Sequence, residues 1–284
     1  MTRALKCLMF TIVLCVGLSQ MNAWAITRDE VMERAKSFAE VDWQCERHNA
    51  SREYNLLEPG KSYLGVSYNW GGFDLPSEFS KKVRSGKVAG NYKKRCGEKL
   101  CVRFDFAGLD CSGFVSRCWQ VRRYSTLEFP IIAIKIPRKL LKPGDILNSR
   151  NKHVVLFHSY DSEGQMWAYE SSSWVRQRGA PPAGVVFRSV DLGNEYVPRR
   201  FYKFINPGDR IRTERSLVAR ERFKGGKRWV IPARTTGTIS KGPEFKEKAQ
   251  SNTKPSDVWY LIDYDNGKRG WSTIRDLILI EEAP

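Results

Sequence analysis

The chain has 284 residues and a formal net charge of +17, from 48 lysines and arginines against 31 acidic residues. This length is enough for one large domain or two smaller ones, and the charge favours anionic partners unless the excess only keeps the protein soluble. After the first 25 residues no long apolar segment follows, which excludes a later transmembrane helix of about 20 residues.

The first 25 residues have the pattern of a secretory signal peptide. Arg3 and Lys6 are their only charges, an apolar run covers residues 8–18, and Ala23-Trp24-Ala25 is a small-x-small cleavage site. The apolar run is shorter than the roughly 20 residues that cross a bilayer, and a membrane anchor is the alternative. We therefore expect a secreted or periplasmic mature chain from about Ile26, with a net charge of +15 and no nucleic-acid partner.

The elements expected after the signal are two helices and then a run of strands. Thr27 and Glu30 have the spacing of a capping box, which predicts a helix to about residue 41. Asp110 is a helix N-cap type of residue and predicts a second helix from Cys111 to about residue 122. Strand character follows at residues 153–160, 166–170, 185–190 and 201–204. This order predicts an α+β domain over residues 26–206.

The last part of the chain has a different pattern. Pro207-Gly208-Asp209 marks a boundary, and short strand segments follow near residues 237–239 and 258–264. Asp265-Asn266-Gly267 supplies the turn of a β-hairpin. These short strands and turns predict a small β-barrel over residues 207–284.

An odd number of cysteines singles out a candidate nucleophile. Five remain after signal removal, so at least one stays unpaired in an oxidising compartment. Cys111 follows the N-cap Asp110, where backbone amides and the helix dipole stabilise a thiolate and can also bind an oxyanion. The alternatives are that Cys111 lies in a disulfide or is an ordinary buried cysteine.

A thiol nucleophile needs a general base, and the chain has only three histidines that could serve as one. His153 and His158 lie five positions apart on one expected strand and therefore face opposite sides. His48 lies near Cys45, but two ligands without a second pair do not make a zinc site. We expect His153, which opens its strand after the turn at residues 143–145, to be the base, and we expect no metal.

A hairpin offers His153 an orienting carboxylate. If residues 161–164 form the loop, Tyr160 pairs with Gln165, and the same register puts His153 diagonal to Glu170. Glu170 would then hold the imidazole as the third member of a triad. The alternative is a solvated surface glutamate, because the sequence does not fix the register of a hairpin.

Four motifs in this order resemble those of the NlpC-type cell-wall peptidases, which are compact papain-like cysteine peptidases of bacteria. The resemblance covers about residues 61–204 and implies a papain-like catalytic domain with helices packed on an antiparallel sheet. Gly237 and Trp271 give residues 207–284 a resemblance to a small bacterial SH3-like β-barrel. The four motifs are Tyr68-Asn69-Trp70-Gly71-Gly72, Asp110-Cys111-Ser112-Gly113-Phe114-Val115, Leu141-Lys142-Pro143-Gly144-Asp145 and His153-Val154-Val155-Leu156.

The resemblance also implies an activity. It is hydrolysis of an amide bond in peptidoglycan stem peptides, commonly between D-glutamate and diaminopimelate, with Cys111 as nucleophile, His153 as base and no cofactor. Stem peptides, or another anionic cell-wall polymer, are then the expected partners. The resemblance further implies that Tyr68 lines the cleft and that Asp110 and Ser112 recognise the amino end of the substrate.

The chain departs from the family in two respects. Most relatives have histidine at the third polar position, where this chain has Glu170, and the stretch from Gly72 to Asp110 is longer than usual. We expect this stretch to shape the cleft and to change the preferred peptide.

The same stretch contains Cys96 and Cys101, which are close enough in sequence to close a small loop. If these two form a disulfide, Cys45 and Cys118 remain as a second pair and Cys111 is free.

Two other classes of function stay open. The same site would serve an amidase that cuts between sugar and stem peptide, or an acyltransferase, and analysis of the products distinguishes these. A non-catalytic protein that binds the cell wall is the second class. Such a protein would show no fast, pH-dependent alkylation at Cys111.

Overall fold

The computed structural model describes residues 26–92, 106–175, 177–223, 225–245 and 258–283. The expected signal peptide at residues 1–25 and the expected Cys96–Cys101 disulfide lie outside these ranges. Every helix within them is too short or too polar to serve as a membrane span.

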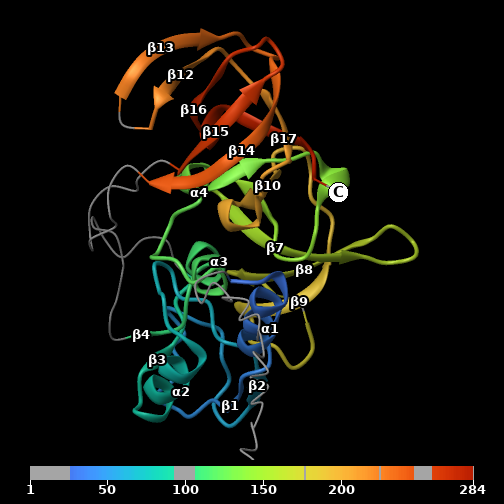
Figure 1. Cartoon of the computed structure of the whole chain (residues 1–284). Coiled ribbons are helices and arrows are strands. Elements are labelled where there is room, and N and C mark those ends of the chain that lie inside the picture. Colours follow the sequence, from blue (N-terminus) through green and yellow to red (C-terminus); the bar gives the residue numbers. More distant parts are fainter. Residues whose placement is uncertain (1–25, 93–105, 176, 224, 246–257, 284) are drawn as a thin grey trace, which may run out of the picture.

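A mixed β-sheet dominates the described chain (Figure 1). Its thirteen strands lie in the order β13-β12-β16-β15-β14-β11-β17-β5-β10-β6-β7-β8-β9. Neighbours are antiparallel except β17 and β5, which are parallel at Ile278 and Lys135. The strands are β5 (Ala133–Lys135), β6 (Ile146–Ser149), β7 (His153–Tyr160), β8 (Met166–Ser172), β9 (Gly184–Val190), β10 (Val197–Phe201), β11 (Arg210–Thr213), β12 (Leu217–Arg222), β13 (Gly225–Ile231), β14 (Thr236–Phe245), β15 (Val258–Tyr264), β16 (Arg269–Thr273) and β17 (Leu277–Glu281).

The helices and the smaller sheets come mostly from the first half of the chain. In Figure 1, α1 lies beside β8 and β9, α2 lies below them, and α3 lies near the centre of the molecule. The helices are α1 (Arg28–Ala39), α2 (Pro76–Arg84), α3 (Cys111–Cys118) and α4 (Phe129–Ile132), with 3₁₀ turns η1 (Arg138–Leu140), η2 (Tyr202–Phe204) and η3 (Ile274–Asp276). Two short pairs complete the set, β1 (Asp42–Gln44) with β2 (Ser62–Leu64), and β3 (Val88–Ala89) with β4 (Phe106–Ala107).

Helix α1 begins where the sequence predicts. The side chain of Thr27 accepts a hydrogen bond from the backbone of Glu30, and the Glu30 carboxylate accepts one from the backbone of Thr27. The helix buries Val31, Ala35 and Phe38, and the Phe38 ring packs edge-on against Phe114 of α3, with centroids 5.6 Å apart. Helix α1 therefore covers one side of the helix that starts at Cys111.

This architecture corrects the fold class that the sequence led us to expect. The α+β arrangement of a papain-like domain, with helices packed on an antiparallel sheet, beside a small C-terminal SH3-like β-barrel is wrong. Most of the regular structure is strand, and strands from both parts of the chain join in one mixed sheet. Strand β17 makes the junction, because it pairs with β11 on one side and with β5 on the other. The division of the chain at residue 207 stays a prediction.

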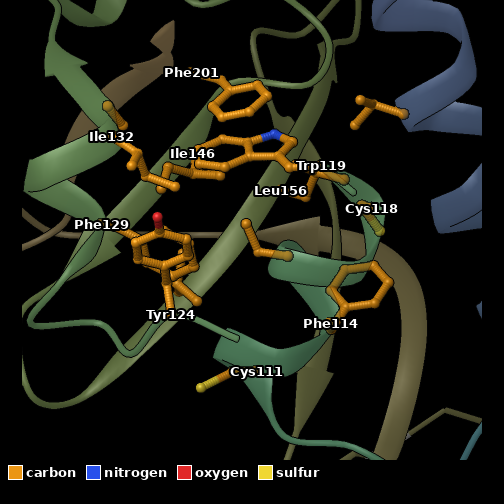
Figure 2. Close-up of a cluster of buried hydrophobic side chains, with 14 of the residues drawn as sticks. Cys111, Phe114, Cys118, Trp119, Tyr124, Phe129, Ile132, Ile146, Leu156 and Phe201 are labelled. Carbon is orange, nitrogen blue, oxygen red and sulfur yellow. The ribbon is translucent and has the colours of Figure 1, made fainter. Parts of the chain in front are cut away.

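An aromatic core fixes the end of α3 that is distant from Cys111. Trp119, which caps this helix, stacks on Phe201 at 4.5 Å between ring centroids and meets Phe129 edge-on at 5.6 Å. Its indole N–H donates to the carbonyl of Gly144 at 3.0 Å. Figure 2 shows Trp119 and Phe201 face to face, with Cys111 at the opposite end of the helix. The core thus holds the orientation of α3 relative to the strands that begin after residue 144.

A buried ion pair holds the turn before β6 against the strand that ends at Phe201. Asp145 and Arg200 have side-chain exposures of 0% and 1%, and the Arg200 guanidinium donates to both carboxylate oxygens. Arg28 donates to Asp145 at 2.9 Å, and Arg200 also pairs with Glu282 near the end of the chain. Breaking a buried pair by removing one partner is costly because the other charge stays buried.

We predict that Arg200→Ala lowers the free energy of unfolding by about 3 kcal/mol or more, since Asp145 is left with Arg28 as its only cationic partner among the residues described. Arg210→Ala is the matched control, because it removes the more exposed pair with Asp265 and should cost clearly less than Arg200→Ala. Urea denaturation followed by tryptophan fluorescence measures both variants. Equal losses in the two variants would contradict the role given to the buried pair.

Candidate active site

Cys111 lies in the first turn of α3, directly after the N-cap residue Asp110, whose side chain is hydrogen-bonded to the start of the helix. Asp110 Oδ1 accepts from the backbone N–H of Gly113 at 2.6 Å and from the Ser112 hydroxyl at 3.0 Å. A side chain at Gly113 would meet the carbonyl of Gly72 at 2.6 Å, so glycine lets the loop at residue 72 approach the helix closely. The backbone amides of Cys111 and Ser112 belong to the first helical turn, where N–H groups have no acceptor within the helix.

Backbone pairing places Tyr68 next to the segment that leads into Cys111. Leu109 donates from its N–H to Ser67 and accepts from the N–H of Asn69, and it forms a parallel bridge with Tyr68. The hydroxyl of Ser171, on β8, donates to the same Leu109 carbonyl at 2.9 Å. The residue two positions before the thiol is therefore fixed to the Tyr68 loop and to the sheet.

His153 lies between the thiol and a carboxylate. Its Nε2 donates to Oε2 of Glu170 at 2.6 Å. Cys111 lies close enough to His153 to act on the pKa of the imidazole. Because Glu170 occupies Nε2, the Nδ1 atom is the ring nitrogen left for the sulfur. Arg188 of β9 donates from Nε to Oε1 of Glu170 at 2.5 Å, so each carboxylate oxygen has a partner. The Glu170 side chain is 4% exposed.

The strand register explains why His153 and Glu170 meet. At the hairpin end Tyr160 pairs with Met166 and not with Gln165, so the expected register is wrong there by one residue. An irregularity between Phe157 and Ser159 removes this offset, and Leu156 then lies opposite Tyr169, as the expected register requires. Continuing this register puts His153 diagonal to Glu170 on one face.

The surroundings of His153 favour its charged form. Burial opposes the charge, but hydrogen bonds to Cys111 and Glu170, together with the negative charges of both groups, raise the pKa of His153 from the ordinary 6.5 to about 10. For Glu170, burial acts to raise the pKa, but His153 and Arg188 outweigh it and leave the pKa below its ordinary value. The site thus holds an imidazolium between a sulfur and an ionised carboxylate.

Two tyrosines border this group. Burial is the main cause that raises the pKa of Tyr68, and the negative charges of Cys111 and Asp110 act in the same direction. Tyr196 meets the His153 ring edge-on, with centroids 6.5 Å apart, and burial followed by the charge of Glu170 raises its pKa. Both phenols therefore stay neutral and can donate hydrogen bonds near the sulfur.

The structure brings together all six site residues that the sequence singled out. His153 donates to Glu170 and lies close enough to Cys111 for the two to affect each other's charge, and Ser112 donates to Asp110 at the helix start. Tyr68 lies alongside the segment that precedes the thiol. Whether these residues act in catalysis or bind substrate stays a prediction.

Sequence reasoning missed three neighbours of this group, namely Arg123, Arg188 and Tyr196. Arg123 forms an ion pair with Asp110. Arg188 pairs across the sheet with Ala168, two positions from Glu170. The position of Arg188 could have been predicted from the sequence. Alternate residues of adjacent strands share a face, and a meander of three strands brings this arginine to the Glu170 carboxylate. Tyr196 precedes β10 and had no comparable signal.

The remaining cysteines and histidines lie elsewhere. Cys45, Cys111 and Cys118 are free thiols, so the expected Cys45–Cys118 pair is not formed. Burial raises the pKa of Cys45 to about 11 and also raises that of Cys118, which keeps both thiols protonated and unreactive. His158 packs against the rings of Tyr169 and Phe187. Within the described ranges no group of three histidine, cysteine or acidic side chains is suited to bind a metal ion.

No protein-family model, no curated protein and no solved structure matches this chain. The motifs of the sequence and the geometry around Cys111 are therefore the basis for a function. That geometry consists of a thiol at a helix start, an imidazole close to it and a carboxylate that accepts a hydrogen bond from the imidazole.

The raised pKa of His153 predicts how Glu170→Gln changes stability with pH. A charged His153 stabilises the fold fully below pH 6.5, and this contribution disappears as the pH rises through about 10. We expect Glu170→Gln to lower the free energy of unfolding by about 3 kcal/mol at pH 6. At pH 10.5, where His153 is largely neutral, Glu170→Gln should lower the free energy of unfolding only by the contribution of the ion pair between Glu170 and Arg188.

Urea denaturation at the two pH values measures this difference. Glu163→Gln, in the exposed loop between β7 and β8, is the matched control and should change stability little at either pH. A loss in Glu170→Gln that is the same at pH 6 and pH 10.5 would contradict the charged pair.

Proposed function

We propose that this protein is an exported cysteine peptidase that hydrolyses an amide bond in peptidoglycan stem peptides, of the γ-D-glutamyl-diaminopimelate type. The observation that carries the proposal is the grouping of Cys111, at the start of α3, with His153 and with Glu170, which accepts a hydrogen bond from the imidazole. Each member supplies a group that acyl transfer through a thiol requires: a nucleophile, a base and an orienting anion.

In the proposed mechanism the proton of Cys111 already lies on His153 before attack, as an imidazolium beside a thiolate, and the sulfur attacks the amide carbonyl carbon. The negative charge that develops on the carbonyl oxygen faces the amides of the first turn of α3. The imidazolium then gives its proton to the departing amine, which leaves a thioester on Cys111. His153 next takes a proton from water, the resulting hydroxide attacks the thioester, and the carboxylic acid leaves as the thiol is restored.

Glu170 and Arg188 act on this mechanism through His153. The carboxylate fixes the ring so that its other nitrogen faces the sulfur, and it stabilises the imidazolium until the proton passes to the leaving amine. Arg188 holds the second carboxylate oxygen, which limits rotation of Glu170. Arg188 is therefore a positioning residue in this proposal and has no direct role in the chemistry.

The choice of a cell-wall substrate depends on the sequence. The four motifs that resemble NlpC-type peptidases include Tyr68, Asp110 and Ser112, which all lie near the thiol. The signal-like first 25 residues, and the strongly positive charge that remains without them, also fit an exported protein with an anionic substrate. A protein that only binds the wall would gain nothing from an imidazolium held between a thiol and a buried carboxylate.

The proposal predicts that purified sacculi release peptide fragments when incubated with the mature protein and that Cys111→Ala reduces the release by about 10³-fold or more. Mass spectrometry of the fragments identifies the bond: cleavage after D-glutamate fits the proposal, whereas intact stem peptides indicate an amidase.

Cys45→Ala is the matched control, because it removes a buried thiol whose hydrogen bond goes to the backbone carbonyl of Glu46. This variant should retain the wild-type rate. Fragment release that survives in Cys111→Ala would contradict the proposal.

A further inference from the structure

The two carboxylates that flank Cys111 are shielded from solvent by arginines. Two carboxylates flank the thiol, Asp110 at the helix start and Glu170 behind the imidazole, and their side chains are only 6% and 4% exposed. Each is covered by an arginine: Arg123 on Asp110, 38% exposed, and Arg188 on Glu170, 39% exposed. An incoming molecule therefore meets guanidinium groups before it meets either carboxylate.

The Asp110 carboxylate has no acceptor position left for a cation from a substrate. Ser112 and Gly113 donate to Oδ1, while the backbone N–H of Gly71 donates to Oδ2 at 3.0 Å. Arg123 also pairs with Oδ2 and neutralises the charge. A substrate ammonium group would have to displace this guanidinium, which a buried carboxylate holds firmly.

Arg123 has N–H groups that make no hydrogen bond to the described residues. Its ion pair with Asp110 uses one terminal nitrogen, and its buried Nε has no hydrogen-bond partner among the described residues. The charges of Arg123, Asp110 and Cys111 all act on the Tyr68 hydroxyl, so the four groups share one small region. A planar guanidinium with free N–H groups matches the geometry of a carboxylate.

We infer that Arg123 forms a carboxylate-binding subsite beside Cys111, so that the preferred substrate carries an anionic group close to the scissile carbonyl. This inference rests on the proposed function and adds the substrate class. Asp110 then acts through Arg123, which it orients, in place of a direct contact with an amino end of the substrate.

Thiol reagents that differ only in charge test the subsite without a known substrate. Iodoacetyl-glycine carries a carboxylate, and iodoacetyl-glycinamide has the same reactive group with a neutral end. The second-order rate constants for alkylation of Cys111 are measured at pH 7 and fixed ionic strength by mass spectrometry of the peptide that contains Cys111. Glutathione gives the intrinsic ratio of the two reagents.

In the wild type we expect the carboxylate reagent to be favoured over the neutral one by about tenfold relative to glutathione, since a charge-assisted bidentate bond is strong. Arg123→Gln should abolish this preference. Arg123→Lys keeps a cation beside Asp110 but loses the planar fork, so an intermediate preference is expected. It also tests the subsite if Arg123→Gln does not fold.

Arg122→Gln is the matched control. Arg122 lies over the Tyr124 ring and pairs with Glu128, and its removal should leave the preference at the wild-type value. If wild type and Arg123→Gln show the same ratio as glutathione, the subsite is overturned while the proposed chemistry stands. If neither reagent modifies Cys111 in the wild type, the proposed function fails, and the subsite fails with it.

Discussion

The pairing of β7 with β8 is the constraint on which the candidate site depends. His153 and Glu170 come from these two strands, and a slip of one residue would turn one of them to the opposite face of the sheet. The irregularity between Phe157 and Ser159 is what sets the register that joins them. Strand β9 extends the same face and adds Arg188 behind the carboxylate. The base, the carboxylate and its arginine are thus products of one three-stranded segment.

The thiol is brought to this face by a different set of contacts. At the end of helix α3, Trp119 packs in the aromatic core and donates a hydrogen bond to the Gly144 carbonyl. At the start of the helix, the backbone of Leu109 is hydrogen-bonded to the Tyr68 loop. The Ser171 hydroxyl connects that backbone to β8, one residue after Glu170. Movement of the helix start relative to the carboxylate would break this bond. The site is therefore rigid because both ends of α3 are anchored.

Local chemistry allowed several parts of this arrangement to be predicted from the sequence. The N-cap Asp110 and the capping box at Thr27 depend only on residues a few positions apart, and both are present. The contact between His153 and Glu170 was also predicted, although by a register that is wrong at the hairpin tip. The predicted contact is present because the extra residue at His158 offsets the one-residue error in the register at the hairpin tip. No rule of sequence spacing indicates an extra residue there.

Contacts between distant segments were not predictable in this way. The fold class was wrong because β17 pairs with β5, more than a hundred residues away, and the strand pattern of residues 207–284 does not reveal which free edge it joins. The Cys45–Cys118 pair was expected by elimination alone, whereas the two thiols lie at separate buried positions. Arg123 covers Asp110 through a turn after α3 that has no sequence signal.

The central claim is that the sulfur of Cys111 and the imidazole of His153 form one coupled pair. A titration of the His153 ring by NMR, in the wild type and in Cys111→Ala, tests this claim most directly. We expect a midpoint near pH 10 in the wild type and a clearly lower midpoint once the sulfur is removed, because the interaction with Cys111 helps to raise that pKa. A midpoint that is the same in both proteins would contradict this claim.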